Sequence, residues 1–268
     1  MTISGLYDVH CHLNDPKYFD LDMTSTEIIL EAKEAGVDFI NNIGYDVKSS
    51  KTAVIQANLS SSVFAVVGIH PNYAHLFTHE AYEIIEELAQ SNEVVGIGET
   101  GLDFSKTDKY QKQQLEAFER QIDLAKKLDL PLMIHLKDHS EQVKVYELAY
   151  KLLKEKQVKK AVIHSYEGPL EWAKKFVKLG FLISVSGIVT HNKKVQSVIS
   201  EISLNSLVVE SDAPYYLPTP YKNSLNYPKF LPLTVKYVAR LKKVSELVVA
   251  QTTRSNAKKL FLKDKVNS

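Results

Sequence analysis

The feature that most constrains the fold of this chain is a regular alternation of short apolar runs with longer amphipathic segments. The runs have the length of buried strands, and the segments between them repeat apolar residues at helical spacing. The expected strands cover Leu6–His10, Asp38–Ile43, Val63–Gly68, Val94–Gly98, Leu132–His135, Ala161–Ile163, Phe181–Val185 and Leu207–Val209. The expected helices cover Ser25–Ala35, Lys48–Leu59, His79–Gln90, Lys109–Leu128, Ser140–Lys156, Leu170–Leu179, Lys193–Ile202, Leu233–Lys242 and Ser245–Leu260. Strands that are each followed by a helix imply parallel pairing through right-handed crossovers.

Two α/β architectures accept this pattern. A closed (β/α)8 barrel uses all eight repeats and typically needs about 250 residues, close to the 268 of this chain. An open, doubly wound sheet is the alternative, and it gathers its working residues at one switch point instead of after many strands. No Pro-, Gly- or Ser-rich linker divides the sequence, so we predict a single domain over residues 1–268.

Residues that can bind a metal follow five of the expected strands. The first strand leads into His10-Cys11-His12, and alternate residues of a strand point to the same side, so these two imidazoles converge. A lone histidine after a strand is more often a structural residue than a ligand, Glu99 alone could cap a helix, and Asp212 alone could form an Asx turn, so the prediction rests on their joint occurrence. The full set is His10, His12, Glu99, His135, His164 and Asp212. Its spread over many strand ends favours a (β/α)8 TIM barrel with a metal site at the C-terminal ends of the strands.

The size of this ligand set indicates how many ions it holds. Four histidines and two carboxylates exceed the needs of one tetrahedral ion, whereas two ions that share a carboxylate account for the number. We assign one ion to His10, His12 and Asp212, the other to His135 and His164, with Glu99 as the bridge. Two divalent ions roughly 4 Å apart can clamp the attacking and leaving oxygens of a hydrolysis. The mixed nitrogen and oxygen donors suit Zn, Mn, Co or Ni, and suit Mg less well.

The motifs around these residues resemble those of the TatD family of metal-dependent nucleases, which are amidohydrolase-like (β/α)8 barrels. The similarity extends over nearly the whole chain, and the combination of motifs is specific although His-x-His alone is not. The matching segments are Asp8–Leu13, Gly68–Pro71, Gly98–Phe104, Pro131–His135, Val162–Gly168, Gly180–Gly187, Glu210–Pro218 and Asn256–Phe261.

Three departures from the family pattern lie near the expected substrate face. Where the family usually has His-x-Arg the chain has Lys137, which keeps the charge but loses the bidentate fork. Where it usually has His-Cys-Phe the chain has Ser165 and Tyr166, and the segment around Asn226 lacks the usual preceding arginines. The ligand set is untouched, so these changes bear on the substrate.

The resemblance implies a deoxyribonuclease of the 3′-5′ exonuclease type, in which metal-activated water attacks a phosphodiester. In that scheme Asp212 orients or deprotonates the water, Glu99 fixes the spacing of the ions, and His70 contacts phosphate or aids the leaving group. Asp8 and Glu210 are candidates to hold the ligands from behind, and each is equally well explained as a buried structural carboxylate. The expected substrate contacts are His70, Lys137, Tyr166 and Tyr215.

The charge and composition of the chain limit the kinds of partner that it can bind. The net charge of +1 gives no global basic field, so nucleic acid must be bound by a local patch of lysines and tyrosines. We expect single-stranded DNA or nucleic-acid ends as the partner, no membrane, and no obligate protein partner. Cys11 is the only cysteine, and neither a signal region nor a spanning run of about 20 apolar residues occurs. The expected location is therefore the cytoplasm.

Two other functions fit the same sequence. The same metals could polarise the carbonyl of an ester, lactone, amide or D-aminoacyl-tRNA link, and a comparison of substrates would decide. A non-catalytic binding protein with a degenerate site is the second alternative, and the intact ligand set argues against it. A serine hydrolase is disfavoured because no Gly-x-Ser-x-Gly elbow occurs.

Overall fold

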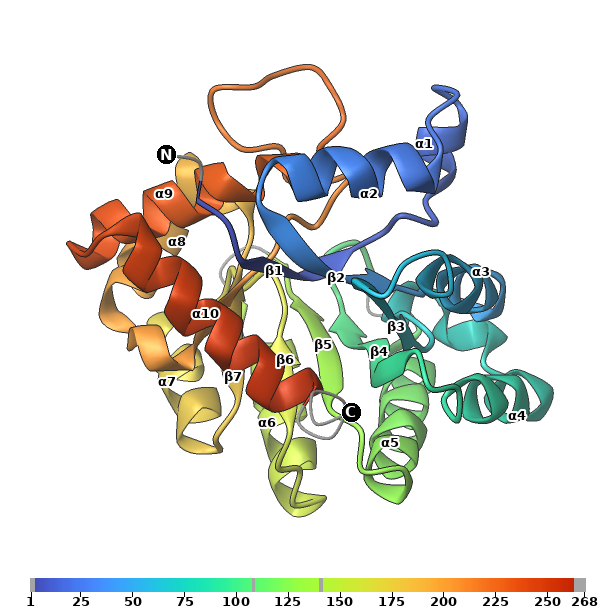
Figure 1. The fold of residues 1–268 in the computed structure, drawn as a ribbon. Helices are drawn as coiled ribbons and strands as arrows, with labels where there is room; N and C mark the ends of the chain where they lie inside the picture. Colours follow the sequence, from blue (N-terminus) through green and yellow to red (C-terminus); the bar gives the residue numbers. More distant parts are fainter. Residues whose placement is uncertain (1–2, 108, 140–141, 263–268) are drawn as a thin grey trace.

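The strands form a single parallel sheet that curls into a barrel (Figure 1). The computed structural model describes residues 3–107, 109–139 and 142–262. Within these residues eight strands pair in chain order, each with the next. They are β1 (Leu6–Cys11), β2 (Val37–Ile43), β3 (Val63–Val67), β4 (Val94–Asp103), β5 (Leu132–Lys137), β6 (Ala161–Ile163), β7 (Leu182–Val185) and β8 (Leu207–Val209).

The ends of the sheet meet at a seam between β1 and the segment that follows β8. There the His12 amide donates to the Ala213 carbonyl at 2.8 Å, and the Asp212 amide donates to the His10 carbonyl at 2.9 Å. A buried carboxylate adds a third link, because Asp8 Oδ1 accepts the Ser211 amide at 2.8 Å. The sheet is thereby closed, and the predicted (β/α)8 barrel is confirmed over the open sheet.

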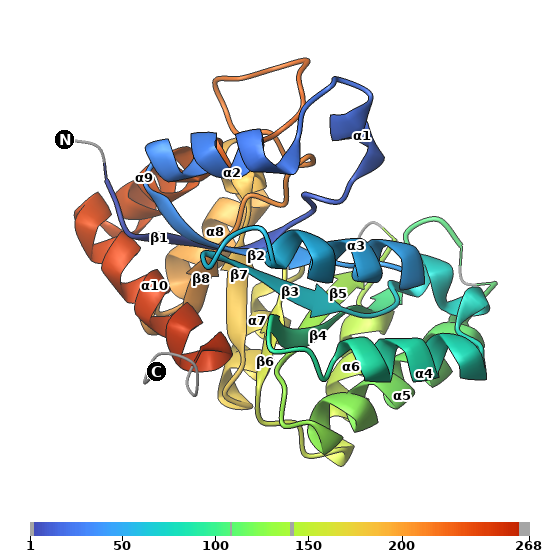
Figure 2. The same ribbon diagram turned by 45° about the vertical axis from the view of Figure 1, so that its right-hand side comes forward.

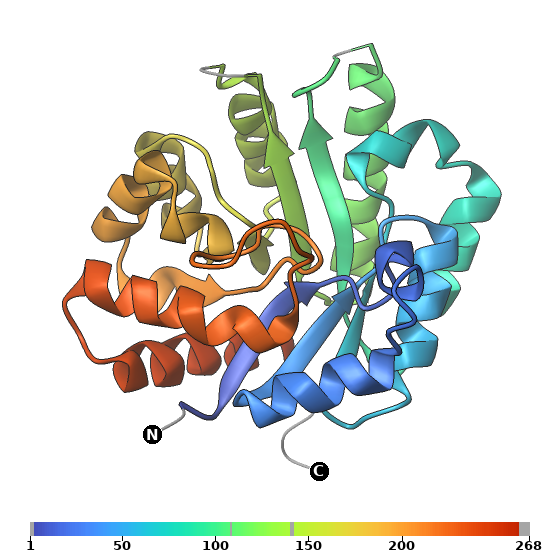
Figure 3. The ribbon, with the colours of Figure 1, turned by 90° about the horizontal axis from the view of Figure 1, so that it is seen from above.

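Helices surround the strands, as the view from above shows (Figure 3). The long ones are α2 (Ser25–Glu34), α3 (Val47–Ala57), α4 (His79–Leu88), α5 (Gln111–Lys127), α6 (Lys144–Glu155), α7 (Leu170–Lys178), α8 (Lys193–Glu201), α9 (Leu231–Lys242) and α10 (Glu246–Phe261). Side chains at the N-termini set where several of these helices begin. At α2, for example, Thr24 and Glu27 form a capping box. The predicted start of α6 at Ser140 lies outside the described residues. Among the described residues, no helix is long and apolar enough to cross a lipid bilayer.

Short elements that the sequence did not predict lie mostly at the C-terminal ends of the strands. They are α1 (Pro16–Phe19) and four 3-10 turns, η1 (Pro71–Leu76), η2 (Gly187–Thr190), η3 (Leu204–Ser206) and η4 (Pro228–Phe230). In Figure 2, α1 and α2 lie beside the long loop that follows β8. The Tyr18 hydroxyl of α1 donates to the Asn226 carbonyl of that loop at 2.7 Å, which ties the two together.

Two apolar layers hold the barrel. The interior layer contains Tyr7, Val9, Val66, Met133 and other inward residues, all buried. The outer layer packs the opposite faces of the strands against the helices. At the N-terminal end, Phe261 of α10 joins the interior layer, with its ring centroid 6.3 Å from that of Tyr7. α10 thus covers the N-terminal end of the interior layer.

Candidate metal centre

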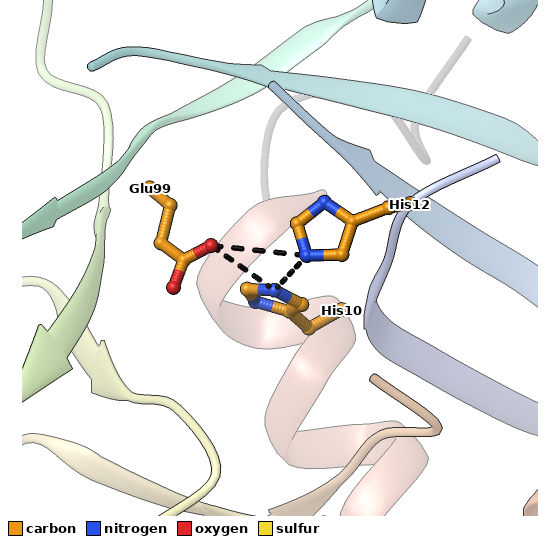
Figure 4. A group of neighbouring side chains, drawn as sticks. All are labelled: His10, His12 and Glu99. Carbon is orange, nitrogen blue, oxygen red and sulfur yellow. Dashed lines mark hydrogen bonds and ion pairs between the residues drawn. The ribbon is translucent and has the colours of Figure 1, made fainter. Parts of the chain in front are cut away.

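The six predicted ligands lie together at the C-terminal ends of the strands. In Figure 4 the side chains of His10, His12 and Glu99 point toward one another. His10 Nε2 lies 3.2 Å from His12 Nε2, and both face Asp212 Oδ1, at 3.5 and 3.6 Å. His135 Nδ1 and His164 Nε2 lie 3.1 Å apart on the other side of Glu99. The donor atoms of residues far apart in the sequence thus converge on one small region.

Glu99 stands between two groups of imidazoles and presents one carboxylate oxygen to each. Its Oε2 lies 3.6 Å from His10 Nε2 and 3.8 Å from His12 Nε2. Its Oε1 lies 2.8 Å from both His135 Nδ1 and His164 Nε2. Glu99 can therefore bridge as the two-ion assignment supposes, although His10 and Asp212 also lie within ligand distance of His164, and the assignment of residues to ions stays a prediction.

Irregularities in two strands aim these ligands. The ladder between β1 and β2 shifts register between Asp8 and Cys11, and His10 faces Glu99 although its neighbour Val9 belongs to the interior layer. The ladder between β4 and β5 shifts between Ile97 and Thr100, the interval that contains Glu99. Such bulges commonly redirect side chains beside active sites. The predicted end of β4 at Gly98 was consequently wrong, because the strand continues through Glu99 to Asp103.

Three of the four imidazoles donate one ring N–H away from the centre. His12 Nδ1 lies 3.0 Å from the Ile43 carbonyl, and His164 Nδ1 lies 3.3 Å from Glu210 Oε1. The Ile43 carbonyl has no proton to give, so the His12 ring is the donor there and its Nε2 faces Glu99. Burial opposes protonation of His164, but the charges of Glu99 and Glu210 outweigh it and raise the pKa of this imidazole, which favours a proton on Nδ1 toward Glu210. This arrangement, in which an outer acceptor fixes the tautomer of a metal-binding histidine, is general at metal sites.

Asp103 plays the same part for His135 and was missed by the sequence reasoning. His135 Nε2 lies 3.2 Å from Asp103 Oδ2, which leaves Nδ1 directed at Glu99. Burial opposes ionisation of Asp103, but hydrogen bonds from His135 and Ser105 outweigh it and hold the pKa of this carboxyl below its ordinary value. The available signal was its place at the end of β4, four residues after Glu99 and on the same side of the strand.

The two carboxylates predicted to support the ligands differ in what they touch. Glu210 contacts a ligand directly, through His164 Nδ1. Asp8 instead accepts the backbone amides of His10 and Ser211, so it braces the seam. Burial raises the pKa of Asp8 to about 8 and also raises the pKa of Glu210. A cationic group nearby would favour their ionised forms, since opposite charge stabilises a buried carboxylate.

His70 lies at the edge of the centre. Its Nδ1 accepts the Asn72 amide at 3.0 Å, so the ring proton is on Nε2, which lies 3.6 Å from Glu99 Oε1. Burial lowers the pKa of His70 to about 3, so the ring is neutral near pH 7. It can therefore donate a hydrogen bond at the mouth of the site without carrying a charge.

The three other expected substrate contacts occupy different environments. Lys137 is at the rim, 44% exposed, with Nζ 3.2 Å from the Tyr216 hydroxyl. Tyr215 is also exposed at the rim, and its hydroxyl donates to Asp15 at 2.7 Å. Tyr166, by contrast, is 3% exposed and donates to the Pro169 carbonyl at 2.7 Å.

The structure therefore does not bring Tyr166 to the substrate face, which corrects the expectation. The residue before it, Ser165, has a left-handed backbone with φ of 39°. The turned chain lets the Tyr166 amide donate to the Ser184 carbonyl at 3.2 Å, and its ring packs against that of Tyr146. Its side chain is part of the outer apolar layer.

The chemistry of the donors fits divalent metal ions. Imidazole nitrogens and carboxylate oxygens from several strand ends converge on one small region, and this mixed donor set is one that Zn, Mn, Co and Ni bind. Within the described residues, three overlapping groups of histidine and carboxylate atoms are close enough to hold an ion, and Glu99 is in two of them. A (β/α)8 barrel with such a centre at its strand ends has the form of a metal-dependent hydrolase.

Comparisons with known proteins agree with this class. The family described as TatD related DNase matches residues 7–262, so the chain belongs to the TatD family. YabD of Bacillus subtilis, described as an uncharacterized metal-dependent hydrolase, is 34% identical over 96% of this chain and 98% of its own. The crystal structure of YjjV, a TatD homologue from Escherichia coli, superposes with a TM-score of 0.87 at 26% identity, covering 96% of this chain and 98% of that one. A TatD family hydrolase from Entamoeba histolytica gives a TM-score of 0.83 at 21% identity, covering 97% and 99%.

Proposed function

We propose that this metal-dependent hydrolase is a deoxyribonuclease that cleaves phosphodiester bonds at the ends of single-stranded DNA, in the 3′-5′ direction, with two divalent ions. The observation that carries the proposal is the division of the two Glu99 oxygens between two groups of imidazoles. Paired sites of this kind are widespread among phosphate-ester hydrolases. The description of the matching family as DNase-related supports the same substrate.

The residues at the centre provide the functions that such a reaction needs. When bound, divalent ions lower the pKa of water toward neutrality and offset negative charge on the phosphodiester. In this proposal the Asp212 carboxylate accepts a proton from the attacking water, and general bases typically contribute about 10²–10⁴-fold to the rate. The neutral His70 ring directs its Nε2 proton toward the centre, where it can donate to a phosphate or leaving oxygen.

Lys137 gives the rim a positive charge suited to a second phosphate of the strand. Its neighbours are the Tyr216 hydroxyl at 3.2 Å and Glu167 Oε1 at 4.0 Å, which hold the ammonium beside the mouth. The nearby anion moderates this charge, and a lysine lacks the fork of an arginine. We therefore expect phosphate contacts that are weaker and less selective than an arginine would make.

The test is degradation of end-labelled single-stranded DNA with Mn²⁺ or Mg²⁺, beside EDTA, Asp212→Asn, and the control Asp129→Asn. Asp129 is exposed and lies before β5 at the opposite end of the barrel. Metal-dependent cleavage that falls about a hundredfold or more in Asp212→Asn but not in Asp129→Asn supports the proposal. Ester and D-aminoacyl-tRNA substrates are assayed in parallel. Turnover of those alone, with metal bound, would refute the nuclease and favour a carbonyl hydrolase.

A further inference from the structure

Tyrosines from separate loops flank the imidazole of His12 at the mouth of the centre. Tyr45 follows β2, and its ring centroid lies 5.8 Å from that of His12 at an interplanar angle of 66°. Tyr215 follows β8, and its ring lies 5.9 Å from that of His12 at 80°. Two phenol rings thus border a predicted metal ligand from different sides.

A third ring extends this surface outward. Tyr73, in η1, stacks on Tyr45 with centroids 5.7 Å apart and planes inclined by 28°. Tyr73 is 37% exposed, whereas Tyr45 is half-buried behind it. The ring of Tyr73 also lies 6.4 Å from that of His70, which faces Glu99. The stacked pair is therefore supported from behind and continuous with the centre.

These two tyrosines differ from the structural tyrosines of the same end of the barrel. Tyr18 and Tyr166 are buried, and their hydroxyls donate to backbone carbonyls. In the part of the chain that the structure describes, the hydroxyls of Tyr45 and Tyr73 make no hydrogen bond. Rings that only fasten a loop are expected to be buried and to satisfy their hydroxyls. A stacked pair whose outer ring is exposed beside the proposed reaction centre is instead suited to a flat ligand.

Positive charge accompanies the rings. Lys17 Nζ lies 4.0 Å from the centroid of the Tyr215 ring, which itself borders His12. A ligand that combines a flat aromatic group with a negative charge matches this surface, and nucleotides have that chemistry.

We propose that Tyr73, backed by Tyr45, is a stacking platform for the base of a nucleotide whose phosphate reaches the centre, while Lys17 contacts a neighbouring phosphate. The inference rests on the proposed nuclease function and adds to it a base-binding subsite. Stacking on a phenol ring is tolerant of base identity, so the subsite selects for the presence of a base and not for a sequence.

The experiment compares end-labelled single-stranded DNA that carries normal terminal nucleotides with the same strand made abasic at one terminal position at a time. The proteins are the metal-loaded wild type, Tyr73→Leu, Tyr73→Phe and the control Tyr221→Leu. Tyr221 is 47% exposed, and its ring centroid lies 4.3 Å from that of Phe230, in a groove lined by α2 and α9. We expect wild type to favour the normal strand by about 5- to 100-fold at one position, the range given by stacking of one base. Tyr73→Leu should lose that preference through KM, while Tyr73→Phe and Tyr221→Leu keep it.

Binding is measured in parallel by fluorescence anisotropy with Glu99→Gln protein, so that the platform is tested apart from turnover. Equal cleavage of normal and abasic strands by wild type would overturn the platform and leave the nuclease intact. If no DNA is cleaved, the proposed function fails, and the binding measurement alone then decides on the platform. Tighter binding of the normal strand than of the abasic strand, lost in Tyr73→Leu, would support the platform, and equal binding of the two strands would overturn it. A loss of preference in Tyr221→Leu equal to that in Tyr73→Leu would also overturn the platform.

Discussion

Replacement of Asp103 by asparagine tests whether a residue behind the centre controls metal affinity. The Asp103–His135 hydrogen bond is 3.2 Å long, and the two side chains are 7% and 16% exposed. The substitution removes the charge, and the new amide can donate to His135 Nε2, which stabilises the tautomer whose Nδ1 proton points at Glu99. The lone pair that would bind metal is then lost.

The expected magnitude follows from two independent considerations. A hydrogen bond to a charged group contributes about 1.5–3 kcal/mol when buried. Loss of an outer partner of a metal-binding histidine typically reduces metal affinity or activity about 10- to 100-fold, and tenfold corresponds to about 1.4 kcal/mol. Both give the same range, so Asp103→Asn should weaken the affinity of the His135–His164 group for Mn²⁺ by 10- to 100-fold.

The assay is competition for Mn²⁺ against a chromophoric chelator, with Ser105→Ala as the control. Ser105 donates its amide and hydroxyl to Asp103 Oδ1, the oxygen that does not face His135. Ser105→Ala therefore loosens the loop while leaving the imidazole partner in place. An Mn²⁺ affinity that is unchanged in Asp103→Asn, or reduced equally by both substitutions, would refute the reasoning.

Two further predictions concern stability. Removal of metal with EDTA should lower the melting temperature by about 8–16 °C relative to protein with the metal at about 1,000 times its dissociation constant. Metal at that concentration stabilises the fold by about 4 kcal/mol, and each kcal/mol shifts the melting temperature of a chain of this size by about 2–4 °C. Identical melting curves would contradict a bound metal. Burial raises the pKa of Tyr18 above its ordinary value near 10, so the stability contributed by the neutral phenol is complete below pH 10 and is lost as the pH rises above it. In EDTA, wild type should therefore lose about 1 kcal/mol more than Tyr18→Phe between pH 10 and 11, measured by urea unfolding, and parallel losses would show that Tyr18 does not couple to alkaline unfolding.

The sequence was sufficient to predict the barrel because each strand is a compact apolar run and each helix repeats its apolar residues at helical spacing. It was also sufficient to predict that the metal donors lie together, since parallel strands end at one face and His10 and His12 lie at the end of the same strand. The boundaries were less accurate at β4, where the glycines around Glu99 resembled a strand end. A bulge accommodates them within the strand instead.

Loop residues could not be placed from the sequence, because their orientation depends on backbone angles that no periodic pattern encodes. Tyr166 follows a strand, as Tyr215 does, yet the left-handed conformation of Ser165 turns its ring into the outer layer. The stacking of Tyr45 on Tyr73 joins loops that follow different strands, and no spacing in the chain predicts that contact.

Because the centre lies at the seam between β1 and the segment after β8, it can form only when the whole barrel has folded. His10 and His12 supply donors from the start of the described chain, and Asp212 supplies one from beyond the last strand, through backbone hydrogen bonds that join the same residues. A growing polypeptide therefore lacks a finished centre until its eighth strand has emerged and docked. If the protein cleaves DNA, partly synthesised or partly unfolded copies of the protein would leave DNA intact.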